Sequence, residues 1–206
     1  MLVSIVLSLI LTFVGSRWID FLYQMPNAPL TFPEEIENRS KFRKPLIFLL
    51  MSMCLINFSE TPMPQFFYTA TIIFFLTLIT FTDFEQYTIF NKMLLPFAIL
   101  GILAAVHLNL PLTDRILSAV IGGGIFLLMA FLSNGGIGGG DVKLVFVLGL
   151  WLGSKMLINV IFAASIFGGL AAIFLLATKK MNRKSYFAYG PYFTLTTLVI
   201  LIFSNF

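Results

Sequence analysis

The sequence predicts an all-α polytopic membrane protein, a bundle of about eight (six to eight) transmembrane helices. Of its 206 residues, 59% are hydrophobic and 11% are charged, whereas roughly 25% of the residues of a soluble domain are charged. The apolar runs are long and continuous, and they lack the two-residue alternation of barrel strands. Because every backbone polar group in hydrocarbon must be bonded internally, such runs cross a membrane as helices.

Eight apolar segments are the predicted helices. They comprise residues 2–22, 46–58, 66–81, 93–106, 116–132, 144–152, 156–177 and 192–206. Several are shorter than the roughly 20 residues that a free-standing span requires, but a bundle or local thinning of the bilayer accommodates short spans. No linker or soluble second domain separates the segments, so residues 1–206 are expected to form a single integral-membrane domain.

The first apolar segment leads into a short cytoplasmic loop, residues 24–44. Arg17 and Asp20 interrupt the segment itself, and no positive residue precedes it, so a removable signal peptide is not expected. The loop is rich in proline, which favours an extended conformation over a helix. Its prolines are Pro26, Pro29 and Pro33.

The basic residues are distributed unevenly over the predicted loops, and this distribution indicates the orientation. If the N-terminus is outside, Arg115 and Lys155 face outwards, and a much larger basic set faces the cytoplasm, as the positive-inside rule requires. That set comprises Arg39, Lys41, Arg43, Lys44, Lys92, Lys143, Lys179, Lys180, Arg183 and Lys184. We therefore expect a multi-pass protein of the cytoplasmic (inner) membrane with its N-terminus outside.

Cysteine and histidine are too scarce for several kinds of site. Cys54 is the only cysteine, so an internal disulfide and a cysteine-built zinc site are excluded. His107 is the only histidine, and a metal site or a Ser-His-Asp triad would depend on this one residue between two apolar spans. The basic residues that give the net charge of +4 fall in the loops. We therefore expect the lipid bilayer, and not nucleic acid, as a partner.

Two aspartates occupy positions where hydrolytic chemistry can occur. Asp83 follows the apolar run 66–82, and Asp141 follows Gly138-Gly139-Gly140. Two predicted spans separate the aspartates, so both should lie at the cytoplasmic boundary. Two adjacent carboxylates cannot both ionise comfortably and tend to share one proton. The ionised group can then take a proton from water while its partner polarises a scissile carbonyl group, so the pair suits metal-free peptide hydrolysis.

Each aspartate also has a simpler interpretation. Asp141 could cap the helix that follows it, and Asp83 could be an ordinary carboxylate at a helix end. The five glycines between residues 135 and 140 favour the catalytic interpretation, because they permit unusual backbone angles and the close approach of a second chain. Glu85 is the chief rival of Asp83 and ranks second. For the glycines at 122–124 we expect close helix–helix approach.

The motifs around both aspartates resemble those of a known family. The string Gly138-Gly139-Gly140-Asp141 fits the GxGD pattern of membrane aspartic proteases, and residues 136–144 are similar to the second signature of type IV prepilin (leader) peptidases. Asp83 resembles the first signature, which continues here as Ile89-Phe90-Asn91, with phenylalanine where the family usually has proline. Weaker similarities are Gly15-Ser16, Met25-Pro26 and Tyr189-Gly190-Pro191-Tyr192.

The resemblance implies an aspartic endopeptidase that removes the basic leader from type IV prepilin or pilin-like precursors at the cytoplasmic membrane face. It implies that Asp83 and Asp141 are the catalytic pair and that Gly138 and Gly140 shape the loop around them. Lys143 would support this loop by tuning Asp141 or by contacting lipid phosphate, although we favour a plain positive-inside anchor for Lys143 and Lys92 alike.

The same resemblance concerns the cofactors. Cleavage in this family needs none. Many bacterial members carry paired CxxC motifs in the first cytoplasmic loop and also N-methylate the new amino terminus. Residues 24–44 contain no cysteine, so we expect no zinc, and S-adenosylmethionine is implied only if methylation is retained.

Two other functions fit part of the pattern. An intramembrane protease of the presenilin or signal-peptide-peptidase type shares GxGD, but its partner motif is Tyr-Asp, whereas Thr82 precedes Asp83 here. The second alternative is a non-enzymatic small transporter or assembly scaffold. Transporters usually place ionisable residues near the bilayer midplane, whereas these carboxylates are expected at the edge. The sequence predicts neither the particular precursor, nor the oligomeric state, nor which aspartate is protonated.

Overall fold

The computed structural model describes residues 2–133, 136–178 and 188–203, and helices dominate these residues. The elements in chain order are α1 (Leu2–Tyr23), the 3₁₀ helix η1 (Pro33–Glu35), α2 (Ile36–Ser40), α3 (Arg43–Asn57), α4 (Met63–Gln86), α5 (Asn91–His107), α6 (Leu112–Leu132), α7 (Gly139–Ala177) and α8 (Gly190–Phe203). The predicted all-α class is confirmed for this part of the chain.

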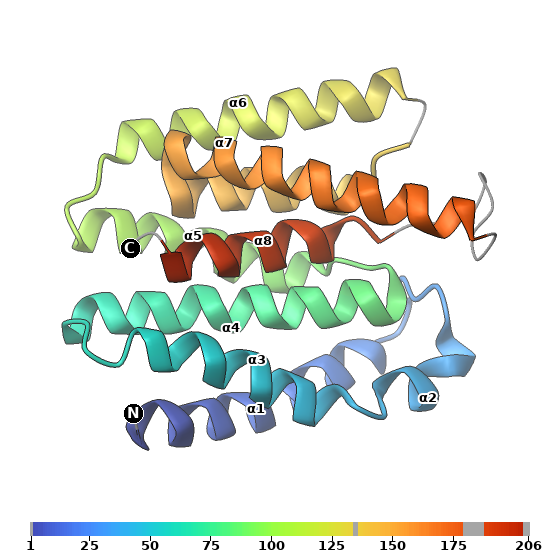
Figure 1. Ribbon diagram of the computed structural model, residues 1–206, viewed down its shortest axis with the longest axis horizontal. Coiled ribbons are helices and arrows are strands. Elements are labelled where there is room, and N and C mark those ends of the chain that lie inside the picture. The colour runs from blue at the N-terminus through green and yellow to red at the C-terminus, as the bar shows by residue number, and fades with distance from the viewer. Residues whose placement is uncertain (1, 134–135, 179–187, 204–206) are drawn as a thin grey trace.

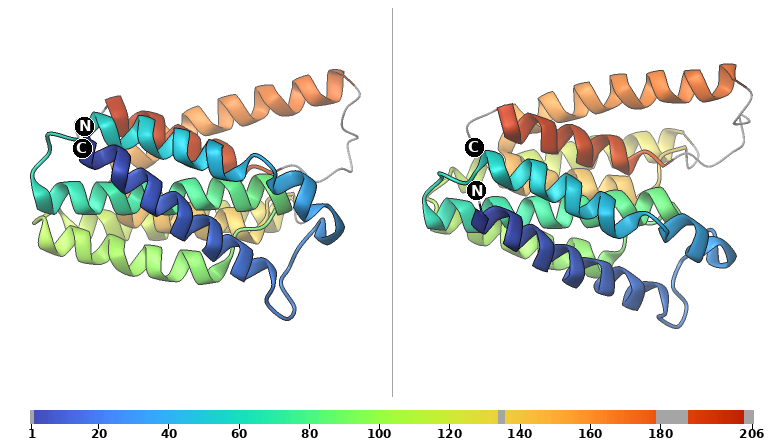
Figure 2. Two further views of the ribbon diagram at one scale, coloured as in Figure 1. Left: turned by 90° about the horizontal axis from the view of Figure 1, so that it is seen from below. Right: turned by 60° about the horizontal axis from the view of Figure 1, so that its bottom comes forward.

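The long helices lie side by side and run lengthwise through the molecule (Figure 1). α3 packs against α1 and α4, α8 packs against α4 and α7, and α6 packs mainly against α7. α1 begins and α8 ends at one end of the bundle (Figure 2). α4 ends at the opposite end, where α5, α7 and α8 begin (Figure 1). We call this opposite end the site end.

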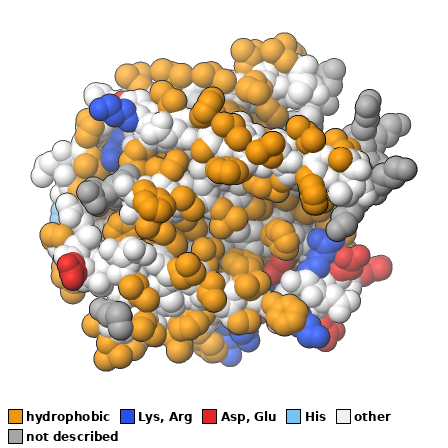
Figure 3. Space-filling view, viewed as in Figure 1, with side chains coloured by type: hydrophobic (Ala, Val, Ile, Leu, Met, Phe, Trp, Pro, Cys, Tyr) orange, Lys and Arg blue, Asp and Glu red, His pale blue; other side chains and the backbone are white. Residues whose placement is uncertain are grey.

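The outer surface of the bundle is apolar. Hydrophobic side chains cover most of the face in Figure 3, and the charged side chains on that face lie mostly along its edges. Leu95, Leu127 and Phe162 are each more than half exposed. A soluble monomer rarely exposes so large an apolar area, whereas lipid covers it favourably. Four helices, α1, α4, α6 and α7, are long and apolar enough to cross a membrane, and α5 and α8 are shorter apolar helices. The chain is therefore a polytopic helical membrane protein.

α7 consists of two helical arms, residues 139–152 and 154–177, joined at Gly153. The chain doubles back there (Figures 1 and 2). Gly153 has φ 72° and ψ −178°, a conformation that glycine adopts without the strain that a side chain would cause. The predicted segments 144–152 and 156–177 are these two arms. The first arm begins at Gly139 rather than at residue 144, because the glycines before Asp141 continue into the helix.

Two side chains from the start of α6 stabilise this reversal. Asp114 accepts a hydrogen bond from the backbone N–H of Ser154 at 3.0 Å and so caps the second arm. Arg115 donates through Nη1 to the carbonyl groups of Leu150, at 3.2 Å, and Trp151 at the end of the first arm. Free carbonyl groups at a buried helix end need such partners.

The prediction that residues 24–44 form an extended loop is wrong for the second half of the loop. Residues 33–40 form η1 and α2, and α3 begins at Arg43. Pro33 is the first residue of η1, a position where proline loses no hydrogen bond and its fixed φ suits a helix. The proline therefore starts a helical turn instead of preventing one.

Some of the predicted features lie outside the described residues. They are Lys179, Lys180, Arg183 and Lys184 of the basic loop, Gly135 of the glycine cluster, and residues 204–206 of the last apolar segment.

Candidate active site

Asp83 and Asp141 meet at the site end. Asp83 lies in the last turn of α4 and Asp141 in the first turn of α7. Their residues are 5% and 9% exposed, respectively. The two carboxyl groups are close enough for their charges to interact, so these two distant sequence positions come together in the fold.

A left-handed residue ends α4 directly after Asp83. Tyr87 has φ 50° and ψ 39°, and its backbone N–H donates to the carbonyl oxygen of Asp83 at 2.9 Å. A left-handed residue is a common way to terminate a helix, because it turns the backbone and bonds a free carbonyl group. The chain then extends to Phe90, and α5 begins at Asn91. Asp83 is thereby held in the final helical turn, at the edge of the bundle.

Gly138, and not Asp141, occupies the cap position of α7. Gly138 has the extended angles φ −66° and ψ 140°, and its carbonyl oxygen accepts hydrogen bonds from the backbone N–H groups of Asp141 at 3.0 Å and Val142 at 3.3 Å. Asp141 is therefore the third residue of the helix and not its N-cap residue, although its carboxyl group also interacts with the backbone N–H of Gly138. A carboxylate in the first turn is nevertheless favoured by the partial positive charge of a helix N-terminus.

Glycines allow the beginnings of α7 and α8 to approach the end of α4. A Cβ atom on Gly190 would lie 2.6 Å from Oδ2 of Asp83 and 3.1 Å from Cδ1 of Ile89. A Cβ atom on Gly140 would lie 3.2 Å from Cβ of Ile89, and one on Gly138 would lie 3.1 Å from Oδ2 of Asp141. The space around the two carboxyl groups is therefore occupied by backbone.

The two carboxyl groups keep oxygen atoms free. Among the described residues, Oδ2 of Asp83 and Oδ1 of Asp141 are buried without a hydrogen-bond partner. A buried polar atom without a partner is rare in a native protein and needs an explanation, such as a catalytic role. Burial raises the pKa of the Tyr189 hydroxyl group, and the charge of Asp141 raises it further. Each of the two carboxyl groups therefore keeps one oxygen atom available for a further partner.

The two lysines near the site have neutral partners. Lys143 donates through Nζ to Oδ1 of Asn91 at 3.0 Å, which connects the first turn of α7 to the first turn of α5. Lys92 contacts Sδ of Met25 through Nζ at 2.9 Å. Both lysine side chains are exposed.

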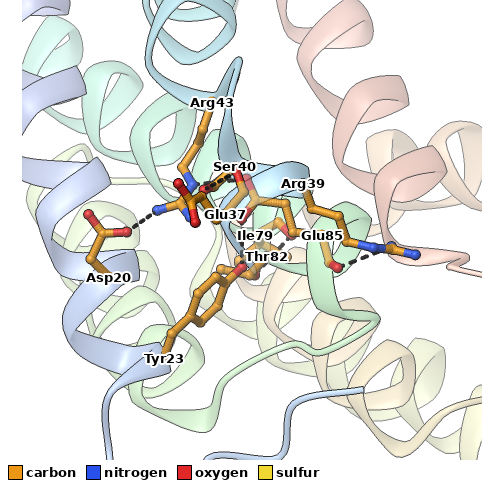
Figure 4. Close-up of polar contacts among 9 residues, drawn as sticks. All are labelled: Asp20, Tyr23, Glu37, Arg39, Ser40, Arg43, Ile79, Thr82 and Glu85. Carbon is orange, nitrogen blue, oxygen red and sulfur yellow. Dashed lines mark hydrogen bonds and ion pairs between the residues drawn. The ribbon is translucent and has the colours of Figure 1, made fainter. Parts of the chain in front are cut away.

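Glu85, the rival carboxylate, belongs to a buried polar cluster (Figure 4). Arg43 donates through Nε to Oε1 of Glu85 at 2.9 Å, and Tyr23 donates its hydroxyl proton to Oε2 at 3.0 Å. Arg43 also pairs with Asp20 at 2.5 Å through Nη1. Both oxygens of Glu85 are therefore engaged in hydrogen bonds. Sequence reasoning missed this cluster, and the one available signal was Asp20, an acid inside an apolar segment.

The first loop is also bonded to the residues that follow Asp83. Gln86 accepts from the backbone N–H of Phe32 at 2.9 Å and donates to its carbonyl oxygen at 3.1 Å. Thr88 donates its hydroxyl proton to the carbonyl oxygen of Pro29 at 2.6 Å. The guanidinium group of Arg39 lies 3.7 Å from the ring centroid of Phe32. The side chains of Gln86 and Thr88 thus bind the backbone of the loop.

Fold and site together define a polytopic helical membrane protein with two interacting acids buried at one end of its bundle. A family model described as "Type IV leader peptidase family" matches residues 70–173, a stretch that contains both aspartates. The chain belongs to the type IV leader peptidase family.

The chain is similar to curated proteins named prepilin leader peptidase/N-methyltransferase. The protein from Neisseria gonorrhoeae is 34% identical over 132 residues, which cover 61% of this chain and 45% of the relative. The protein from Bacillus subtilis is 31% identical over 130 residues, 62% of this chain and 52% of the relative. The protein from Aeromonas salmonicida is 28% identical over 175 residues, 79% of this chain and 59% of the relative.

The matched part of the chain spans about half the length of these relatives, from 45% to 59%. No solved structure matches the chain significantly.

Proposed function

We propose that this chain is a membrane aspartic endopeptidase that removes the basic leader peptide from type IV prepilin or pilin-like precursors. One observation carries the proposal. Two buried carboxyl groups from different helices interact at one end of the bundle, and each keeps a free oxygen atom among the described residues. Membership of the type IV leader peptidase family and the names of the relatives support the same activity.

In the proposed mechanism Asp83 and Asp141 are the catalytic pair. One carboxylate accepts a proton from a bound water, whose oxygen attacks the carbonyl carbon of the scissile peptide bond. The other group, which holds the shared proton, first polarises the carbonyl oxygen and then supplies a proton to the departing nitrogen. The C–N bond breaks, and the products are a new carboxyl group on the leader and a new amino terminus on the precursor.

In this proposal, glycines and a lysine near the pair hold the helix ends that carry the two acids. Gly138 and Gly140 give the first turn of α7 the close approach that brings Asp141 towards Asp83, and Gly190 does the same for α8. Lys143 holds the start of α7 to α5 through Asn91. A glycine before the cut would suit such a site, because glycine lowers the cost of unwinding a helical substrate.

We further propose that the chain crosses the inner membrane eight times with its N-terminus outside. The crossing stretches are α1, α3, α4, α5, α6, the two arms of α7, and α8. Arg39, Lys41, Lys44, Lys92 and Lys143 then lie at a cytoplasmic site end, where the positive-inside rule favours basic residues. In this topology a precursor's leader reaches Asp83 and Asp141 from the cytoplasm.

The test is a cleavage assay with purified protein. Leader-bearing peptides with a basic leader, a glycine and an apolar helix are incubated with the wild-type protein and with Asp83→Asn and Asp141→Asn, and products are read by mass. Both variants should stay folded and fail to cut. Glu60→Gln, a matched carboxylate-to-amide change at an exposed residue, should cut normally. Cleavage by either aspartate variant would remove that residue from the mechanism.

The same assay tests the second activity in the relatives' names. Each reaction is run with and without S-adenosylmethionine, the methyl donor that this activity requires. A product heavier by one methyl group only when the donor is present would assign methyl transfer to this chain as well. An unmodified product would restrict the chain to cleavage.

A further inference from the structure

An apolar groove of about 820 Å³ lies between α5, α6 and the first arm of α7. Leu95, Leu127, Phe146 and Val147 form part of its walls. Leu95 is 66% exposed and Leu127 is 62% exposed, so the groove is open towards the outside of the bundle. Its volume falls within the roughly 300–1,000 Å³ that is typical of small-ligand sites.

The groove reaches only part of the way through the bundle. Its lining along α5 extends from Asn91 to Ala98, a distance of about 10 Å at the usual rise of a helix. The hydrocarbon core of a bilayer is about 30 Å thick, so one leaflet contributes about 15 Å. The groove therefore begins at the site end and stays within one leaflet.

The mouth of the groove is positively charged. Lys92 and Lys143 line it beside Asn91. The Nζ atom of Lys92 contacts a thioether sulfur, and that of Lys143 donates to a side-chain amide oxygen. Among the described residues neither lysine forms an ion pair. An ammonium group has three donors and no acceptor, so each lysine can bind an anion and keep its present contact.

Gly124 leaves the groove open on the side of α6. A Cβ atom on Gly124 would meet nothing within 4 Å, whereas one on Gly122 would lie 2.8 Å from Cδ2 of Leu157, and one on Gly123 would lie 3.0 Å from Cβ of Phe146. The predicted close helix–helix approach therefore holds at Gly122 and Gly123. Gly123 and Gly124 both line the groove, but only at Gly124 is the added Cβ atom free of neighbours.

We propose that this groove binds one anionic phospholipid, with its phosphate between Lys92 and Lys143 and an acyl chain along α5, α6 and α7. Basic pockets between transmembrane helices are known lipid headgroup sites. A precursor's transmembrane helix fits less well, because a helix with its side chains is about 10–12 Å wide and needs a groove through the full depth of the bilayer. Lipid binding is independent of proteolysis, so the two proposals can fail separately.

The charged mouth is tested by native mass spectrometry of the purified full chain. Protein in non-ionic detergent is titrated with phosphatidylglycerol or with phosphatidylcholine of the same acyl chains. We expect one phosphatidylglycerol to be retained preferentially. Lys92→Gln with Lys143→Gln should weaken this binding about thirtyfold, given the usual contribution of each lysine near an anionic headgroup. The control Lys41→Gln with Lys44→Gln removes the same charge from exposed residues elsewhere on the chain and should bind normally.

The apolar part is tested by filling the groove. Gly124→Leu places a larger apolar side chain in the groove, with a Cβ atom that meets nothing within 4 Å, and should abolish retention of the lipid. The matched control is Gly169→Leu, because a Cβ atom there also meets nothing within 4 Å and Gly169 does not line the groove. Lipid retention by Gly124→Leu at the wild-type level would overturn the proposal, as would equal retention of both lipids by the wild-type protein.

Two further measurements separate the alternative occupants. Soluble glycerol phosphate should not displace the lipid at equal concentration, and efficient displacement would show that the lysines bind phosphate without the acyl chain. A photo-crosslinking residue at Leu95 should capture lipid in membranes. Capture of the precursor in place of lipid would assign the groove to substrate and overturn the proposal.

Discussion

Arg43 and Glu85 form an ion pair with Nε and Oε1 2.9 Å apart, and both side chains are only 2% exposed. Glu85 lies two positions after Asp83 in the chain, and Arg43 is the first residue of α3. Tyr23, the last residue of α1, donates to the same carboxylate. The Arg43–Glu85 pair and Tyr23 therefore join α1, α3 and α4, two positions after Asp83 in the chain.

Removal of one partner of this pair should destabilise the protein strongly. Arg43→Met leaves Glu85 as a buried charge without its cation, a change that typically costs about 3–5 kcal/mol. The double variant Arg43→Met with Glu85→Met should lose less free energy of unfolding than the sum of the losses of the two single variants, because neither charge of the pair is then left without its partner. Reversible unfolding in mixed detergent micelles measures these values. Glu35→Gln, which breaks the exposed pair with Arg39, should cost at most about 1 kcal/mol. An equal cost for Arg43→Met and Glu35→Gln would contradict the buried role.

Gly190→Ala should impair cleavage more than stability. The added methyl group would lie 2.6 Å from Oδ2 of Asp83, so either the carboxyl group or the start of α8 must shift. We expect kcat to fall by at least about tenfold, since a displacement of about 1 Å in a catalytic group costs up to about a hundredfold. Gly139→Ala is the matched control in the first turn of α7, because its Cβ atom would meet nothing within 4 Å. Similar kcat values for both variants would show that Gly190 does not position Asp83.

Gly153→Ala should destabilise the reversal inside α7. Gly153 has φ 72°, where a side chain is strained by about 1–3 kcal/mol, and its Cβ atom would also collide with the carboxylate of Asp114. The same unfolding measurement should show a loss of at least about 1 kcal/mol. Gly169→Ala, in open space on the second arm, should be neutral or slightly stabilising because alanine favours a helix. A neutral Gly153→Ala would mean that the reversal tolerates another conformation.

Single-cysteine labelling should place the two ends of the bundle on opposite sides of the membrane. Cys54 is the only cysteine and is buried, so Cys54→Ser gives a background without thiols. Asn38→Cys lies next to the site end, and Glu60→Cys lies between α3 and α4 at the other end. In intact cells a membrane-impermeant maleimide should label Glu60→Cys. It should label Asn38→Cys only after the cells have been permeabilised. The reverse result would invert the proposed topology.

Hydropathy was sufficient to predict the long apolar helices. A chain that crosses a bilayer needs long apolar runs, and a helix satisfies the backbone hydrogen bonds of such a run within the run itself. Hydropathy could not place the beginning of the first arm of α7. Glycine is a poor helix former, so hydropathy and propensity favour a loop at residues 139 and 140, yet both are helical. A Cβ atom on Gly140 would lie 3.2 Å from Cβ of Ile89, a contact that depends on tertiary packing. The 3₁₀ turn at Pro33 was missed for a related reason, since proline stops a helix in its interior and starts one at its first position.

The meeting of Asp83 and Asp141 could be anticipated by counting spans, because an even number of crossings returns the chain to the same side. The pairing of Arg43 with Glu85 could not, since it depends on how α1, α3 and α4 rotate against one another. In the sequence, only the resemblance of residues 189–192 to a family motif draws attention to Gly190. Its contact with Asp83 needs the position of α8, which no local pattern determines.

Because of the reversal at Gly153, the length of the first arm of α7 determines the position of Asp141. Asp114 and Arg115 hold the far end of this arm, and its rigid length of about 20 Å sets the height of Asp141. One extra residue anywhere in this rod would swing Asp141 by about 100° around the axis and away from Asp83. An insertion of one residue in this arm is therefore expected to separate the two acids, whereas a substitution that keeps its length is not.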